Sequence, residues 1–98
     1  MDDDSTARLR VADDLHLTWR DHLVSVGTSR YEPGVFLYDI AYLTVEARPG
    51  RGRVRVRLAS RGESVDHQVL RFEVDEAAYP PVERFFARVR AHRDRLRG

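Results

Sequence analysis

The fold is decided by residues 53–58, Arg53-Val54-Arg55-Val56-Arg57-Leu58, in which charged and apolar side chains alternate without interruption. Successive side chains of a β-strand point to opposite faces, so this stretch predicts a strand with one buried face and one basic face. Residues 49–52 (Pro-Gly-Arg-Gly) predict a hairpin loop before it, and residues 40–47 resume the alternation on the other side of that loop. A last strand is predicted at residues 65–74, after a turn at residues 61–63. Its inward side chains are expected to be Leu70, Phe72 and Val74.

The same pattern continues toward the N-terminus in shorter pieces. Residues 8–11, 15–20 and 22–26 alternate polar and apolar side chains, and residues 35–37 are apolar. These pieces are separated by turn signals at Asp13-Asp14, at Arg20-Asp21 and at residues 31–34. The Pro-Gly pair within residues 31–34 fits a type II turn. About six or seven antiparallel strands are therefore expected before the C-terminal segment.

Only the C-terminal segment has helical spacing. Pro81 suits a first helical position, because its missing N–H needs no partner there. The apolar side chains that follow recur at helical spacing, and they are Val82, Phe85, Phe86 and Val89, with Leu96 continuing the stripe. The expected fold class is α+β: a twisted antiparallel sheet or half-barrel of about six or seven strands, capped by one C-terminal helix.

Length and composition limit the organisation and the chemistry. The chain has 98 residues, enough for one domain, which we place at residues 7–98 after a disordered acidic tail at residues 1–6. The absence of cysteine excludes disulfides and thiol chemistry. All 17 basic residues are arginine, so no lysine is present to form a Schiff base. The absence of Lys and Asn favours a GC-rich bacterial genome, and no secretory signal or long apolar run is found, so a cytoplasmic location is expected.

The order of elements, together with the segment Val35-Phe36-Leu37-Tyr38-Asp39-Ile40-Ala41-Tyr42-Leu43, resembles the bacterial pleckstrin-homology-like (PH-like) domains. The resemblance covers about residues 7–96. It implies a half-barrel closed by the C-terminal helix. Lipid-binding members carry basic residues around the first hairpin turn, whereas this chain has Asp13-Asp14 there, which would repel a phosphate. The resemblance therefore supports the scaffold more than it supports lipid binding.

The basic face of residues 53–58 is the most distinctive candidate site. Arg53, Arg55 and Arg57 would lie about 7 Å apart on one face, a spacing that suits the phosphates of nucleic acid. Tyr42 and Tyr38 could lie nearby as stacking surfaces. Four other side chains would project from the same face, namely Glu46, His67, Arg71 and Glu73. Ordinary cross-strand ion pairs, Glu46 with Arg53 and Glu73 with an arginine, therefore explain the pattern at least as well.

Two functions are the main candidates. The first is a non-catalytic module that binds another protein, or a second copy of itself, through a strand edge and the groove beside the helix. Its rim would carry tyrosines and helix arginines, namely Tyr31, Tyr42, Tyr79, Arg84 and Arg88. The second is anion binding, of nucleic acid or an acidic membrane surface, through Arg53, Arg55 and Arg57. A third, a half-barrel that holds a small apolar ligand, would need a cavity that the large apolar side chains are able to fill themselves.

Enzymatic activity is not expected. The four histidines lack the spacing of a metal site, and no serine stands in a nucleophile motif. We therefore predict no catalytic residues, no metal and no cofactor.

Overall fold

The structure is a computed structural model that describes residues 6–29, 34–60 and 69–96. Within these residues the first sheet contains four antiparallel strands in sequence order. They are β1 (Thr6–Ala12), β2 (Leu15–Arg20), β3 (Leu23–Thr28) and β4 (Gly34–Asp39).

The second sheet contains three antiparallel strands, again in sequence order. They are β5 (Leu43–Gly50), β6 (Arg53–Ser60) and β7 (Val69–Asp75). A short 3-10 turn, η1 (Glu76–Ala78), leads into the helix α1 (Tyr79–Leu96). The η1 turn is tied to the second sheet, because the backbone N–H of Glu76 donates to the carbonyl of Gly52 at 2.9 Å.

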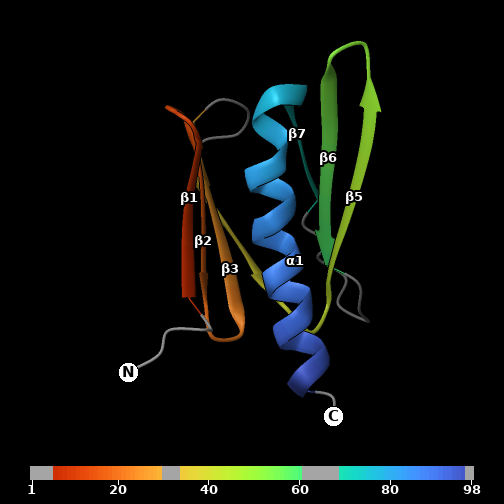
Figure 1. Cartoon of the computed structure of the whole chain (residues 1–98). Helices are drawn as coiled ribbons and strands as arrows, with labels where there is room; N and C mark the ends of the chain where they lie inside the picture. Colours follow the sequence, from red (N-terminus) through yellow and green to blue (C-terminus); the bar gives the residue numbers. More distant parts are fainter. Residues whose placement is uncertain (1–5, 30–33, 61–68, 97–98) are drawn as a thin grey trace.

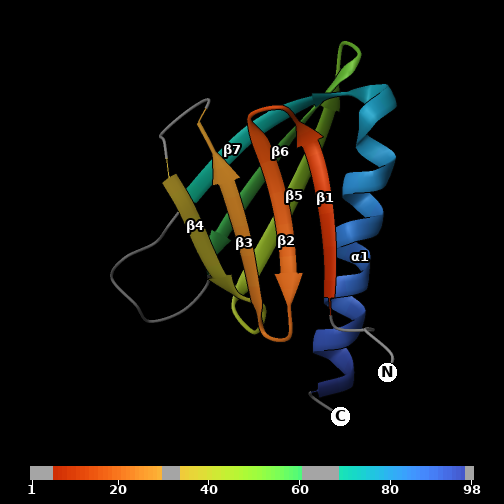
Figure 2. The ribbon, with the colours of Figure 1, turned by 90° about the vertical axis from the view of Figure 1, so that its left-hand side faces the viewer.

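The two sheets face each other, and α1 runs between the β1 side of the first sheet and the β5 side of the second (Figure 1). Figure 2 shows the strands of the first sheet crossing in front of those of the second. Burial of the alternate side chains drives this arrangement. The core combines Leu15, Leu17, Trp19, Val24 and Val26 of the first sheet with Val54, Val56, Leu58, Leu70, Phe72 and Val74 of the second and with Val82, Phe85, Phe86 and Val89 of α1.

The β5–β6 hairpin is closed by a two-residue loop, since Gly50 pairs with Arg53. Both loop residues have positive φ, 54° for Arg51 and 79° for Gly52. Turns of this kind match the right-handed twist of the strands they join. The loop therefore fixes the register of β5 against β6, which decides the side chains that meet on the outer face.

The strand and helix predictions are confirmed in their main features. The expected inward residues of β7 are buried, and Phe85 and Phe86 fill the space under the helix, edge to face with ring centroids 5.0 Å apart. The chain is α+β and antiparallel as predicted.

Several details differ from the predictions. The strands form two sheets, because residues 40–42 turn the chain between β4 and β5 and no ladder joins those two strands among the described residues. Thr6 belongs to β1 and not to the tail. Leu96 does not continue the buried stripe: it is 65% exposed, because the last turns of α1 extend beyond the sheets (Figure 1). The predicted tail at residues 1–5, the turn at residues 31–33 and the turn at residues 61–63 lie outside the described residues.

Candidate functional site

A groove runs between α1 and β5, the outer strand of the second sheet. It contains two hollows of about 240 and 230 Å³. The first lies over Leu43 and Val89, and the second over Ala47 and Val82. Val45, Phe86 and Arg90 line both, so the hollows follow one another along the same strand and the same helix.

The backbone of β5 offers unpaired groups toward this groove. In an antiparallel pair, the N–H and C=O of alternate residues point toward the partner strand and away from it. The Leu43 carbonyl points away from β6, since it accepts a hydrogen bond from Nη1 of Arg93 in α1 at 3.2 Å. Pro49 lies opposite Val54 and has no N–H. Proline is tolerated there because the N–H at this position would point away from β6 and form no hydrogen bond with it. The alternation then directs the N–H and C=O of Val45 and Ala47 outward, which is the arrangement that accepts an added strand.

The rim of the groove is basic and aromatic. Arg90 and Arg93 border it on the helix side. The Nε of Arg93 is buried without a hydrogen-bond partner, and the Asp94 carboxylate lies 3.7 Å from it. Tyr42, which is 54% exposed, stands in the turn immediately before Leu43. Tyr79 lies at the other end, where burial and the Glu83 carboxylate raise its pKa against the opposing effect of Arg90. A partner with apolar side chains and a nearby carboxylate would complement these groups.

Arg84 and Arg88, predicted at the rim of this groove, lie elsewhere on α1. Arg88 faces β1 and β2: its Nη2 donates to the Thr6 carbonyl at 3.3 Å, and its guanidinium stacks over the Trp19 ring, 5.7 Å from the centroid. Arg84 precedes Arg88 by one helical turn, so the two side chains lie on the same side of α1. Arg84 is two residues from the groove residue Phe86, which is a rotation of about 200° around the helix axis and places it on the opposite side. The structure thus places Tyr42 at the groove and both of these arginines away from it.

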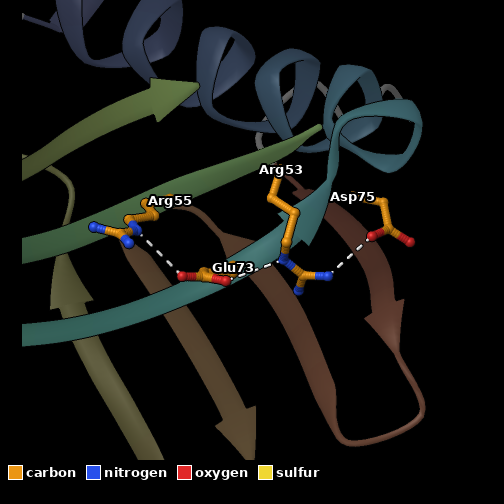
Figure 3. Close-up of polar contacts among 4 residues, drawn as sticks. All are labelled: Arg53, Arg55, Glu73 and Asp75. Carbon is orange, nitrogen blue, oxygen red and sulfur yellow. Dashed lines mark hydrogen bonds and ion pairs between the residues drawn. The ribbon is translucent and has the colours of Figure 1, made fainter. Parts of the chain in front are cut away.

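The three arginines of β6 lie on the outer face of the second sheet, as predicted, and each has an acidic partner. Glu73 accepts from the Nε of Arg53 at 3.0 Å and from the Nε of Arg55 at 3.2 Å, and Arg53 also reaches Asp75 at 3.1 Å (Figure 3). Arg57 lies 3.8 Å from Glu46. Contrary to the expectation, neither tyrosine stacks beside these arginines. Tyr42 precedes Leu43 at the end of the β5–β6 ladder opposite Arg53, and Tyr38 is buried in the core. The expected ion pairs of Glu73 with arginines are therefore present, whereas the expected Glu46–Arg53 pair is wrong, because the register places Glu46 opposite Arg57.

The outer face is nevertheless not balanced in charge. We call it the arginine face, and it carries Arg48, Arg53, Arg55, Arg57 and Arg71 against Glu46, Glu73 and Asp75. The register places Arg48 directly opposite Arg55, and Arg57 directly opposite Arg71. Like charges in such positions repel. Neither Arg48 nor Arg71 forms an ion pair with a described residue, and both line an open hollow of about 850 Å³ on this face.

Other parts of the described chain offer little for chemistry. Arg10 in β1 forms an ion pair with Asp13 at the first hairpin turn, which leaves that turn poorly suited to a phosphate. No group of three histidine or acidic side chains that could hold a metal is found among the described residues. The described part of the chain also has no helix that is both long and apolar enough to cross a membrane.

No protein-family model, curated protein or solved structure matches this chain. The candidate sites are accordingly defined by geometry alone. Arg93 and Arg48 were missed from the sequence, because their positions depend on long-range packing and register. Arg71 could be placed on the basic face by alternation, but its position opposite Arg57 could not be foreseen.

Proposed function

We propose that this chain is a non-catalytic binding module that takes up an extended segment of a partner protein along the outer edge of β5. The observation that carries the proposal is the coincidence of outward backbone groups at Val45 and Ala47 with the two hollows between β5 and α1. Strand addition supplies main-chain hydrogen bonds, and hollows beside the edge receive alternate side chains of the added strand.

The chemistry of the groove suggests the kind of segment bound. Leu43, Phe86 and Val89 provide an apolar floor for one side chain of the partner. Arg90 and Arg93 stand beside that floor and favour an acidic residue nearby. We therefore propose an extended peptide with an apolar residue followed or preceded by Asp or Glu.

The arrangement of two sheets and a C-terminal helix is compatible with a PH-like fold, and we propose that the chain is a bacterial, cytoplasmic member of that class. The α+β arrangement supports this proposal, as does the Asp39-Ile40 step between β4 and β5. Small PH-like scaffolds without clustered catalytic groups are consistent with binding rather than catalysis.

A second copy of the chain is another candidate partner. β4 is the outer strand of the first sheet, and it exposes Val35 and Leu37, which are 67% and 54% accessible. An exposed apolar edge strand favours pairing with another edge. Self-association through β4 stays a prediction, and sedimentation of the chain across a range of concentrations tests it.

The proposal is tested by selecting binders from a library of random twelve-residue peptides and measuring their affinity for two variants. Ala47→Pro removes the outward N–H, and it costs no ladder hydrogen bond because Pro49 already occupies the equivalent position two residues further on. Ala47→Val retains the N–H and is the matched control. We expect Ala47→Pro to weaken the selected peptides at least tenfold and Ala47→Val to change their affinity less than threefold. The proposal fails if no selected peptide responds to Ala47→Pro.

A further inference from the structure

We infer that the arginine face is a second binding site, for a ligand that carries several linked phosphate groups. This site is separate from the groove, because it lies on the outer face of the second sheet and no described residue of α1 lines its hollow. The arrangement of the arginines, their incomplete pairing and the shape of the face each support the inference.

The arginines form two pairs in which the members are direct neighbours. Arg48 and Arg55 oppose each other between β5 and β6, and Arg57 and Arg71 oppose each other between β6 and β7. Strand spacing and residue rise place the centres of these pairs about 8 Å apart. An anion between the members of a pair would convert their repulsion into attraction.

The internal carboxylates do not satisfy these groups. Glu73 serves both Arg53 and Arg55, and Glu46 reaches Arg57 at the loose distance of 3.8 Å. Among the residues that the structure describes, five arginines against three carboxylates leave two positive charges in excess on the face. The side chains stay accessible, since that of Arg55 is 80% exposed.

Phosphate suits this surface better than a carboxylate does. A ligand must compete with Glu46 and Glu73, and a terminal phosphate carries more charge and more acceptor oxygens than either. The planar guanidinium also binds phosphate through two parallel hydrogen bonds. A single phosphate engages one pair, whereas linked phosphates reach both, so the affinity is expected to rise with chain length.

Nucleic acid is a poorer fit to the same face. Sites for single-stranded nucleic acid combine arginines with aromatic side chains on which the bases stack. Phe72 lines the hollow on the arginine face but is only 2% exposed, so the described residues present no accessible aromatic ring to a base there. A phosphodiester chain also lacks the doubly charged end groups of inorganic polyphosphate, so it gains less from displacing a carboxylate.

The test is calorimetric titration of the whole chain with orthophosphate, tripolyphosphate and long-chain inorganic polyphosphate in 50 mM salt. The probe variant is Arg48→Glu with Arg71→Glu. The control is Arg20→Glu with Arg95→Glu, which changes the net charge equally at exposed positions outside both sites. We expect affinity to increase along the ligand series, and the probe variant to bind polyphosphate at least tenfold more weakly while the control changes less than threefold.

Three results would overturn the inference: no measurable binding of polyphosphate, an equal loss in the control variant, or tighter binding of a single-stranded DNA of matched charge. Titration with ATP distinguishes the source of the phosphates, because a nucleotide site would bind ATP more tightly than tripolyphosphate. Ala47→Pro is expected to leave polyphosphate binding unchanged, so the failure of this inference and the failure of the groove proposal are distinguishable.

Discussion

Replacing Arg71 with glutamate is expected to stabilise the protein while it disrupts one of the two arginine pairs of the proposed phosphate site. Arg71 lies directly opposite Arg57, and the substitution turns a repulsive cross-strand pair into an attractive one. Two charges about 6 Å apart in water interact by about 0.7 kcal/mol, and screening at physiological salt roughly halves this value. The change of sign therefore gives a gain of about 0.5–1 kcal/mol in the free energy of unfolding, or about 3–6 °C in Tm.

The assay is urea unfolding of the wild type, Arg71→Glu and Arg71→Gln at low salt and in 1 M NaCl. Glutamine has nearly the shape of glutamate without its charge, so it isolates the electrostatic part. We expect Arg71→Gln to give about half the gain of Arg71→Glu, and both gains to shrink at high salt. A glutamate variant no more stable than the glutamine variant at low salt would refute the charge reasoning, as would a gain that persists undiminished in 1 M NaCl.

Three further predictions concern stability. The Tyr38 hydroxyl is buried without a hydrogen-bond partner, so Tyr38→Phe should raise the unfolding free energy by about 1 kcal/mol. Burial raises the pKa of Tyr38 to about 12 from its ordinary 10.0, so the wild type should lose about 2–3 kcal/mol as the pH rises from 10 to 12, a loss that Tyr38→Phe lacks and that pH-dependent urea unfolding measures. Phe86→Ala should lower the free energy of unfolding by about 3–5 kcal/mol, whereas Leu96→Ala, at an exposed position, should lower it by less than about 0.5 kcal/mol. Thermal unfolding measures both, and equal effects would show that Phe86 is not part of the core. Arg88→Ala should cost about 1 kcal/mol through its lost contacts with β1 and β2, whereas Arg84→Ala should have almost no effect on the urea midpoint.

The strands and the helix could be predicted because their signals are local. Apolar side chains alternate at residues 53–58 and recur at helical spacing from Val82 to Val89. Each pattern indicates an apolar face that must be buried, and these faces form the core. The division into two sheets could not be predicted in this way. It depends on the turn at residues 40–42, where the carboxylate of Asp39 accepts from the Ala41 N–H and the Asp39 carbonyl from the Tyr42 N–H.

The sites were harder to predict than the fold, because they depend on packing between distant segments. Alternation alone placed Arg53, Arg55 and Arg57 on one face. The meeting of Arg48 with Arg55 requires the register set by the Arg51-Gly52 loop, a detail with no signature in the alternation itself. The groove likewise depends on which side of α1 faces β5, and a helical repeat without its neighbours does not specify that side.

The most direct test of the groove is amide hydrogen exchange, measured by NMR on the isotope-labelled chain with and without a peptide selected for binding. Strand addition at β5 predicts that the amides of Val45 and Ala47 exchange quickly in the free protein and become strongly protected in the complex. Their unchanged exchange in a saturated complex, with protection at β4 or on the Arg84 side of α1 instead, would contradict the account.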